Sequence, residues 1–282
     1  MKLILRKNDS ATSLLLFIYN NYFLKTSKDS LKLSSLLNIL KVFDKSETAI
    51  RMSLSRAVKL GFLENSKHKN EVVYTLSDQG KQSVELWNEG VTSFWKRYKR
   101  RNLHWDRKWY LINIEFSDDK KQRIEIIDKL QQLGFALINT NTWICPFYQN
   151  AELNEVVERY NLKTGLVEIF GEMNIRKDTN DFLDEVYNLV VLKDRYRDFI
   201  STYETKLLKT KEISKEEEFI NSGQALPLLH ELGWQFFSIA SEDLVLPKQL
   251  LPHWEGDEAA IIMKEYRELL IEASWKFLDR FE

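Results

Sequence analysis

One stretch decides how the first third of the chain folds: Ser46-Glu-Thr-Ala-Ile-Arg-Met-Ser-Leu-Ser-Arg-Ala-Val-Lys-Leu-Gly61. Ser46 is suited to cap a helix, because its hydroxyl can accept a hydrogen bond from a free N–H group of the first turn. Gly61 is suited to end the helix, because glycine adopts the left-handed conformation without steric cost. Four residues repeat with helical spacing and are predicted to pack inward: Ile50, Leu54, Ala57 and Val58.

The residues on either side of this helix predict the rest of the module. A helix is expected around residues 14–22, a short extended piece at 31–33, and a second helix that starts at Ser34 as its N-cap. After Gly61, two β-prone runs at 62–66 and 71–76 surround a polar tip, which is typical of a hairpin. Another helix should follow to about residue 98. This order is that of a winged helix-turn-helix.

The winged helix-turn-helix prediction implies contact with DNA, because an α-helix fits the major groove, where base edges can be distinguished. Arginine can pair with guanine through two hydrogen bonds, and the hairpin tip can reach phosphates. The predicted DNA-binding residues are Ser46, Thr48, Arg51, Ser55, Arg56 and Lys59 on the helix, and Lys67, His68 and Lys69 on the hairpin. The alternative interpretation is a solvated helix face with ordinary surface charges.

The distribution of charge favours the DNA interpretation. Residues 1–104 contain 19 Lys and Arg against 9 Asp and Glu, a net charge of +10. The remaining residues contain 22 against 33, a net charge of −11, so the overall value of −1 conceals a basic part and an acidic part. Such a division indicates a module that meets a polyanion.

The middle of the chain changes its hydrophobic period. Strands are predicted at 109–116, 135–138, 142–147 and 166–170, with helices at 118–133 and 152–160. The first of these helices is predicted to bury Ile124, Ile127, Leu130 and Leu133. The order βαββαβ is typical of a ferredoxin-like fold, in which two helices cover one face of an antiparallel sheet. We therefore predict a mixed α+β protein.

The last hundred residues are predicted to be helical, at 181–208, 215–240 and 257–280, with a Leu-Pro-rich loop at 246–254. The aromatic residues here, such as Phe236, Trp254 and Tyr266, either line a pocket for an apolar ligand or form the core of the helical block. His253 lies in the loop and is freer to contact a ligand.

Several function classes lack support. We find no glycine-rich phosphate loop, no metal-ligand spacing and no readable catalytic triad, so we predict no enzyme activity, no cofactor and no metal. Glu115 and Asp118, at the end of the first middle strand, leave open a metal-dependent nuclease as the alternative. The single cysteine, Cys145, is expected in the core. No apolar run approaches the length of a membrane span, and we predict a cytoplasmic protein.

Three stretches together resemble the PaaX family of repressors, which control phenylacetate degradation in bacteria. The first is Thr48 to Leu63, with Tyr74-Thr-Leu-Ser-Asp-Gln-Gly80 at the end of the hairpin. The second is Trp105-Asp-Arg-Lys-Trp-Tyr-Leu111, and the third is Leu246-Pro-Lys-Gln-Leu-Leu-Pro-His-Trp-Glu-Gly256. The resemblance covers nearly the whole chain, and the order of the three stretches is more specific than any one of them.

The resemblance implies three domains: a winged helix over 1–98, a Cas2-like ferredoxin fold over 105–175, and a helical domain over 179–282. It also implies a homodimer that binds a partly palindromic double-stranded operator and is released by an aryl-coenzyme A thioester such as phenylacetyl-CoA. Carried over, the DNA-reading positions are Thr48, Arg51, Ser55, Arg56 and Lys59. Candidate effector residues are Arg195, Arg197, His253 and Trp254, with Lys193 beside them. A third alternative is a DNA-binding adaptor whose helical block binds another protein.

Overall fold

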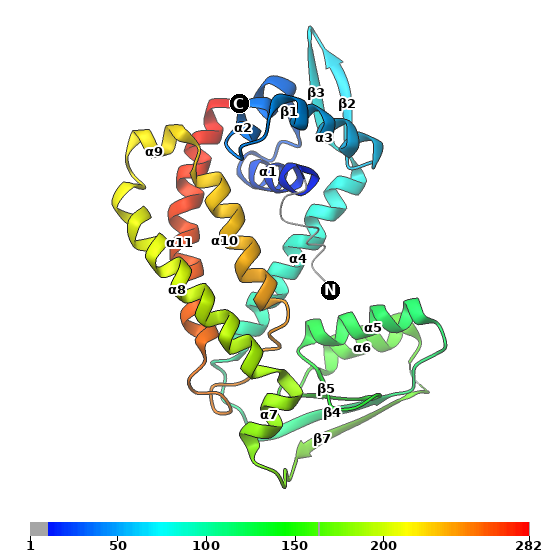
Figure 1. Ribbon diagram of the computed structural model, residues 1–282. Coiled ribbons are helices and arrows are strands. Elements are labelled where there is room, and N and C mark those ends of the chain that lie inside the picture. The colour runs from blue at the N-terminus through cyan, green and yellow to red at the C-terminus, as the bar shows by residue number, and fades with distance from the viewer. Residues whose placement is uncertain (1–10, 163, 282) are drawn as a thin grey trace. The chain divides into compact units, whose positions relative to one another are not determined.

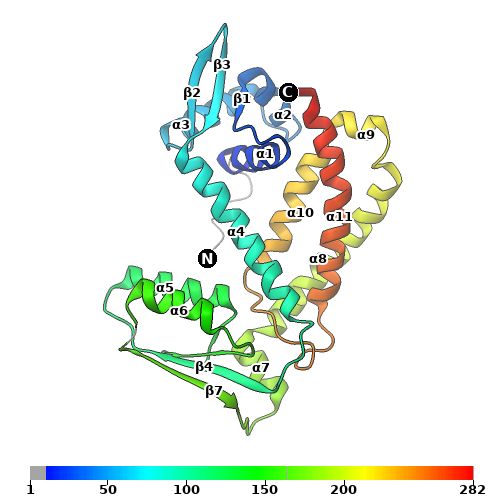
Figure 2. The ribbon, with the colours of Figure 1, turned by 180° about the vertical axis from the view of Figure 1, so that it is seen from behind.

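The computed structural model describes residues 11–162 and 164–281 and shows a mixed α+β protein (Figures 1 and 2). Packing divides these residues into two compact units. The terminal unit comprises residues 11–88, 198–237 and 258–281, and the central unit comprises residues 89–162, 164–197 and 238–257. Each unit is therefore assembled from segments that are distant in the sequence.

The N-terminal elements have the order expected of a winged helix: three helices followed by a hairpin. A short strand pairs with the hairpin, so that the three-stranded antiparallel sheet has the order β1-β3-β2. The elements are α1 (Ala11–Thr26), β1 (Ser30–Lys32), α2 (Leu33–Lys41), α3 (Glu47–Lys59), β2 (Leu63–His68), β3 (Glu71–Leu76) and α4 (Asp78–Arg100).

One detail of this region differs from the sequence prediction. Ser34 was predicted to cap α2, but Lys32 occupies the N-cap position and Ser34 lies inside the first turn. The Ser34 hydroxyl donates instead to the Glu71 carboxylate, at the start of β3. This hydrogen bond is the first cause of a lowered pKa of Glu71, because it favours the charged carboxylate.

The core of the terminal unit includes residues from the far end of the chain. Leu226, Phe277 and Leu278 are buried in the same cluster as the apolar residues of α1, α2, α3 and the hairpin. Ile18 and Leu36 of that cluster are fully buried. The first 88 residues therefore do not close their core alone.

The central unit contains the predicted βαββαβ order, with a four-stranded sheet in the order β5-β6-β4-β7 and every neighbouring pair antiparallel. Helices α5 and α6 cover one face of this sheet (Figure 1). These features are those of a ferredoxin-like fold. The elements are β4 (Lys108–Ile114), α5 (Lys120–Leu133), β5 (Ala136–Leu137), β6 (Thr142–Cys145), α6 (Asn150–Tyr160), β7 (Leu166–Glu172) and α7 (Thr179–Tyr187).

The buried face of α5 was predicted incorrectly in part. Ile126 and Leu130 are buried in the core of the central unit, whereas Ile124 is 61% exposed. Ile124 lies half a turn away from Ile126, so a face centred on residues 126 and 130 turns it to the surface. Cys145 is buried in this core, as predicted.

The C-terminal part is helical, but two predicted helices are each divided in two. The helix expected over 181–208 is interrupted at Asn188, whose φ of 53° ends α7 in the left-handed conformation. The helix expected over 215–240 is interrupted at Gly223, whose φ is 72°. The elements are α8 (Leu189–Ile213), α9 (Glu217–Ser222), α10 (Ala225–Ala240), α11 (Glu255–Leu278) and a final 3₁₀ turn (Asp279–Phe281).

Three of the large aromatic side chains of this part are buried. Phe236 and Tyr266 are both almost fully buried, and Trp254 is 7% exposed. In the part of the chain that the structure describes, no helix is long and apolar enough to cross a membrane.

Candidate nucleic-acid interface and effector region

Helix α3 begins and ends as its sequence predicts. The Ser46 hydroxyl accepts a hydrogen bond from the backbone N–H of Ala49 at 3.2 Å, which satisfies one of the free donors of the first turn. Gly61 follows the helix with a φ of 77°, in the left-handed region that glycine favours. Ile50, Leu54 and Ala57 are buried, so the opposite face of the helix is turned outward.

That outward face carries all five predicted DNA-reading residues. Each of the following side chains is exposed: Thr48, Arg51, Ser55, Arg56 and Lys59. Arg51 is held by Glu47, one turn earlier, through hydrogen bonds of 2.8 and 3.0 Å to a single carboxylate oxygen. Both partners are about half exposed, so this ion pair contributes little stability and can be exchanged for another acceptor.

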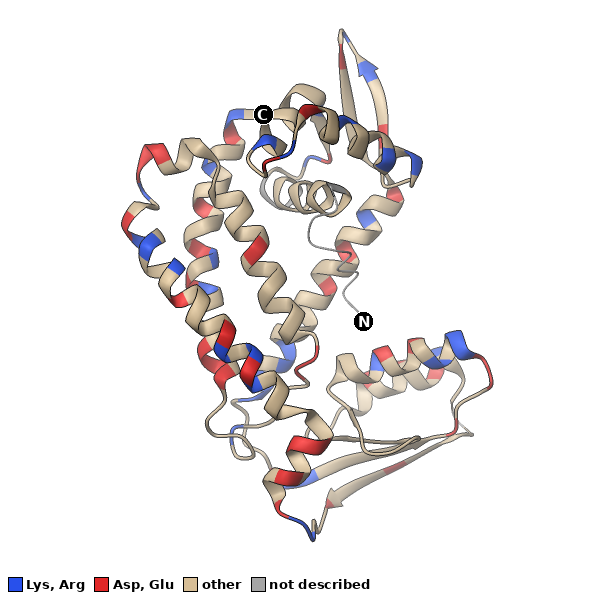
Figure 3. Ribbon diagram, viewed as in Figure 1, with Lys and Arg blue, Asp and Glu red and all other residues tan. Residues whose placement is uncertain are grey.

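The hairpin presents the predicted basic tip. Strands β2 and β3 pair from Leu63 with Leu76 to His68 with Glu71, and Lys67, His68 and Lys69 are exposed. Figure 3 shows the lysine and arginine residues on α3 and near this tip. The base of the hairpin is buried at Leu63 and Leu76.

A glycine fixes the junction between the hairpin and α4. The backbone N–H of Gly80 donates to the Ser77 hydroxyl at 3.0 Å, and a Cβ at Gly80 would lie only 2.2 Å from the carbonyl oxygen of Phe62. Backbone atoms cannot give way as a flexible side chain can. This close approach explains why the motif ends in glycine.

The basic run Lys96-Arg-Tyr-Lys-Arg-Arg101, at the end of α4, contributes a buried network in the central unit. Arg101 is 1% exposed and forms a two-pronged ion pair with Asp257, at 2.7 Å and 2.9 Å. It also donates to the carbonyl oxygens of Leu246 and Leu251 in the Leu-Pro-rich loop. Arg101 therefore holds this loop in place. Its position in a run of basic residues did not predict this buried structural role.

A second buried acid organises the same loop. Asp243 is buried and accepts hydrogen bonds from the Tyr196 hydroxyl and the Trp254 indole N–H, each at 3.0 Å. Its other oxygen accepts from the N–H of Val245, which has a φ of 62°. A β-branched residue in the left-handed region is strained, and the hydrogen bond to Asp243 helps to hold it there.

Three of the four predicted effector residues take part in protein contacts. Arg195 pairs with Glu242 at 2.9 Å, Arg197 pairs with Glu255 at 3.0 Å, and Trp254 is bonded to Asp243 as described above. Lys193 also approaches Glu255, at 3.4 Å. His253 is exposed in the loop. Their role in effector binding stays a prediction.

The residues of the nuclease alternative, Glu115 and Asp118, are both exposed. Within residues 11–162 and 164–281, we find no group of three or more His, Cys, Asp or Glu side chains placed to hold a metal ion.

Comparison with known proteins gives consistent matches along the chain. Residues 10–80 match the family described as PaaX-like protein, residues 102–182 match the PaaX protein central Cas2-like domain, and residues 187–280 match the PaaX-like protein C-terminal domain. The chain is 24% identical over 254 residues to the transcriptional repressor PaaX of Escherichia coli K12, covering 89% of this chain and 77% of that protein.

Among solved structures, the chain resembles the uncharacterized protein Rv0674 of Mycobacterium tuberculosis. The TM-score is 0.59, with 15% sequence identity, and the match covers 94% of this chain and 97% of the other. At this identity the likeness concerns the fold alone.

Proposed function

Because the chain belongs to the PaaX family, we propose that it is a DNA-binding transcriptional repressor that acts through α3 and the hairpin and is released from its operator by an acyl-coenzyme A thioester. The role requires binding alone, and we propose no catalytic step. The three-domain division into residues 1–98, 105–175 and 179–282 is part of the same proposal.

The observation that carries the DNA-binding proposal is the two-sided character of α3. One face is buried in the core of the terminal unit at Ile50 and Leu54, and the other presents Arg51 and Lys59 to solvent. A helix fixed in this way can enter the major groove without rearrangement of the core. The exposed hairpin tip supplies lysines for phosphate contacts that set the register of the helix.

Dimerisation and ligand release extend this proposal to regulation. A two-fold dimer would place two copies of α3 on half-sites about one helical turn apart, or a multiple of that distance. If a ligand binds more tightly to a form of the dimer in which the two copies of α3 do not match the half-sites, ligand binding lowers the affinity for the operator. Operator binding then lowers the affinity for the ligand by the same factor. We propose a phenylacetyl-CoA-like thioester as that ligand, which is the effector class that the family resemblance implies.

The test is a mobility shift with double-stranded DNA that flanks the protein's own gene. Arg51→Ala should weaken specific binding about 5- to 150-fold for each half-site, since a two-pronged arginine–guanine contact contributes about 1–3 kcal/mol. Lys276→Ala is the matched control, because Lys276 pairs with Glu272 one turn away at 2.8 Å and is about as exposed as Arg51. The control should bind as tightly as the wild type.

The outcomes separate the parts of the proposal. Equal operator affinity of Arg51→Ala and wild type, with circular dichroism showing both folded, would refute α3 as the recognition helix. Operator binding that phenylacetyl-CoA does not release would refute that thioester as the effector and leave the repressor role standing.

A further inference from the structure

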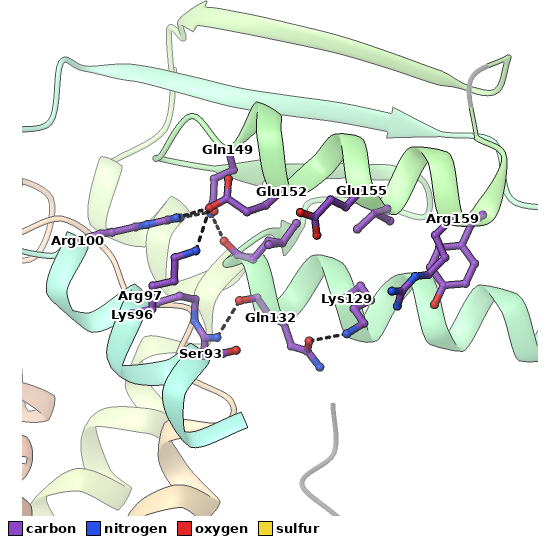
Figure 4. A pocket seen from close by; sticks show the side chains of 13 residues that line it. Ser93, Lys96, Arg97, Arg100, Lys129, Gln132, Gln149, Glu152, Glu155 and Arg159 are labelled. Carbon is purple, nitrogen blue, oxygen red and sulfur yellow. Dashed lines mark hydrogen bonds and ion pairs between the residues drawn. The ribbon is translucent and has the colours of Figure 1, made fainter. Parts of the chain in front are cut away.

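A pocket in the central unit lies between the last turns of α4 and the helices α5 and α6. Its volume is about 190 Å³, and Figure 4 shows the side chains that line it. Five of these are cationic: Lys96, Arg97, Arg100, Lys129 and Arg159. Two are carboxylates, Glu152 and Glu155, so the lining carries a net charge of +3.

The positive charge of the pocket is only partly neutralised. Glu152 accepts from both Lys96 at 3.2 Å and Arg100 at 2.9 Å. Among the described residues, neither Lys129 nor Arg159 is paired with a carboxylate, and Lys129 donates only to the amide oxygen of Gln132 at 3.3 Å. Two cations thus face the pocket with capacity for an anionic partner.

Arg97 provides an independent indication of a ligand. It is 8% exposed, and its terminal nitrogens donate to the carbonyl oxygens of Gln132 at 2.8 Å and Asp243 at 3.5 Å. Its Nε is buried and has no hydrogen-bond partner among the described residues. Among the described residues only carbonyl oxygens accept from this buried guanidinium and no carboxylate pairs with it, so its charge favours an anion in the adjoining pocket.

The size and chemistry of the pocket define the ligand class. Guanidinium and ammonium groups recognise phosphate oxygens by charge-assisted hydrogen bonds. A volume near 190 Å³ is below the range of about 300–1,000 Å³ that is usual for whole drug-sized ligands, so the pocket fits part of a ligand. Phosphate groups have the required negative charge and fit the small volume when the remainder of the molecule extends out of the pocket.

We propose that this pocket binds the phosphate groups of a small molecule. The choice of a coenzyme A thioester as that molecule rests on the proposed function, whereas the phosphate site itself rests on Lys129, Arg159 and Arg97. The site is distinct from the predicted effector residues Arg195, Arg197, His253 and Trp254. Arg97 and Arg100 belong to α4, the helix that follows the hairpin in the sequence.

The experiment is isothermal titration of the full chain, without DNA, with phenylacetyl-CoA and separately with inorganic pyrophosphate. The pocket variant is Lys129→Gln with Arg159→Gln, which removes two charges that no carboxylate of the described residues balances and should leave the fold intact. The control variant is Lys206→Gln with Lys211→Gln, which also removes two charges but from the surface of α8, where they pair with Glu231 and Glu265. Melting curves establish that both variants are folded.

We expect both probes to bind the wild type and the control equally, and the pocket variant to bind each at least tenfold more weakly. Unchanged affinity in the pocket variant, or a weakening in the control instead, would overturn the site. If neither probe binds the wild type, the site is overturned also. Binding of pyrophosphate alone, abolished in the pocket variant, would support the phosphate site and refute the thioester.

Because the titration contains no DNA, failure of the repressor proposal is detected separately. A chain that binds both probes in the pocket but no operator would contradict the proposed function and leave this inference intact.

Discussion

Removal of the Asp257 carboxylate should destabilise the protein far more than removal of a surface acid. In Asp257→Ala, the buried Arg101 guanidinium is deprived of both hydrogen bonds to its counter-charge, at 2.7 Å and 2.9 Å. The Tyr98 hydroxyl is also deprived of its acceptor, at 2.9 Å. Arg101 keeps its hydrogen bonds to the loop carbonyl groups, so it remains buried and charged.

The size of the effect follows from burial. Breaking a buried ion pair on one side costs about 3–5 kcal/mol. The Asp257 side chain is 25% exposed, which admits some water and places the ion-pair cost near the lower limit. With about 1 kcal/mol for the Tyr98 hydrogen bond, the expected destabilisation is about 3–4 kcal/mol. At roughly 2–4 °C per kcal/mol for a chain of this size, the melting temperature should fall by roughly 6–16 °C.

Calorimetry of the full chain measures this fall, with Glu265→Ala as the control. Glu265 pairs with Lys211 at 2.9 Å, but both side chains are about half exposed, so the control should be destabilised by about 0.5 kcal/mol or less. A second comparison is Arg101→Met combined with Asp257→Leu. This variant should recover part of the stability, because no unpaired charge remains buried. If Asp257→Ala melts within about 2 °C of the wild type, the argument that this pair holds the loop is refuted.

Three further outcomes are expected. Lys67→Ala with Lys69→Ala should weaken binding to DNA of any sequence and lower the slope of log affinity against log salt by about 2 for each protomer, or about 4 for the proposed dimer, because each lysine would neutralise one phosphate; an unchanged slope would exclude the hairpin tip from the interface. Gly80→Ala should lower the melting temperature markedly, because its Cβ would lie 2.2 Å from the Phe62 carbonyl oxygen, and a wild-type melting curve would contradict that geometry. Burial raises the pKa of Cys145 to about 11, so at pH 8 iodoacetamide should modify it only after unfolding by urea; rapid modification of the native protein would contradict its burial.

The parts of the fold that the sequence predicted are those with local signals. Ser46 and Gly61 bound α3 because capping and left-handed conformation depend on single residues, and the change of hydrophobic period placed the strand around Tyr110. The break at Asn188 was not predicted because asparagine is only a weak signal for the left-handed conformation, and the apolar pattern continues across it. Ile124 was misplaced because the five apolar residues on α5 allowed two overlapping faces.

The site residues that could be predicted are likewise those with a local signal in the sequence. The exposed face of α3 follows from helical period alone, so its residues were predictable. Arg101, Asp257 and Asp243 were not, because their roles depend on contacts that no local pattern records: 156 positions separate Arg101 from Asp257, and 47 positions separate Tyr196 from Asp243. The pocket around Arg97 also needs α4, α5 and α6 together, and a run of basic residues in the sequence does not distinguish a buried arginine from a solvated one.

The shared core of the terminal unit has a consequence for synthesis of the protein. Leu226, Phe277 and Leu278 lie in the cluster that also holds α1, α2 and α3, so a nascent chain that has reached only the hairpin lacks part of the apolar surface that supports its recognition helix. Ribosomes that stall before about residue 277 would release products without a closed core, which proteases remove readily. Such fragments would be poor competitors for the operator. The arrangement thus couples the proposed capacity to occupy DNA to translation of the chain through α11.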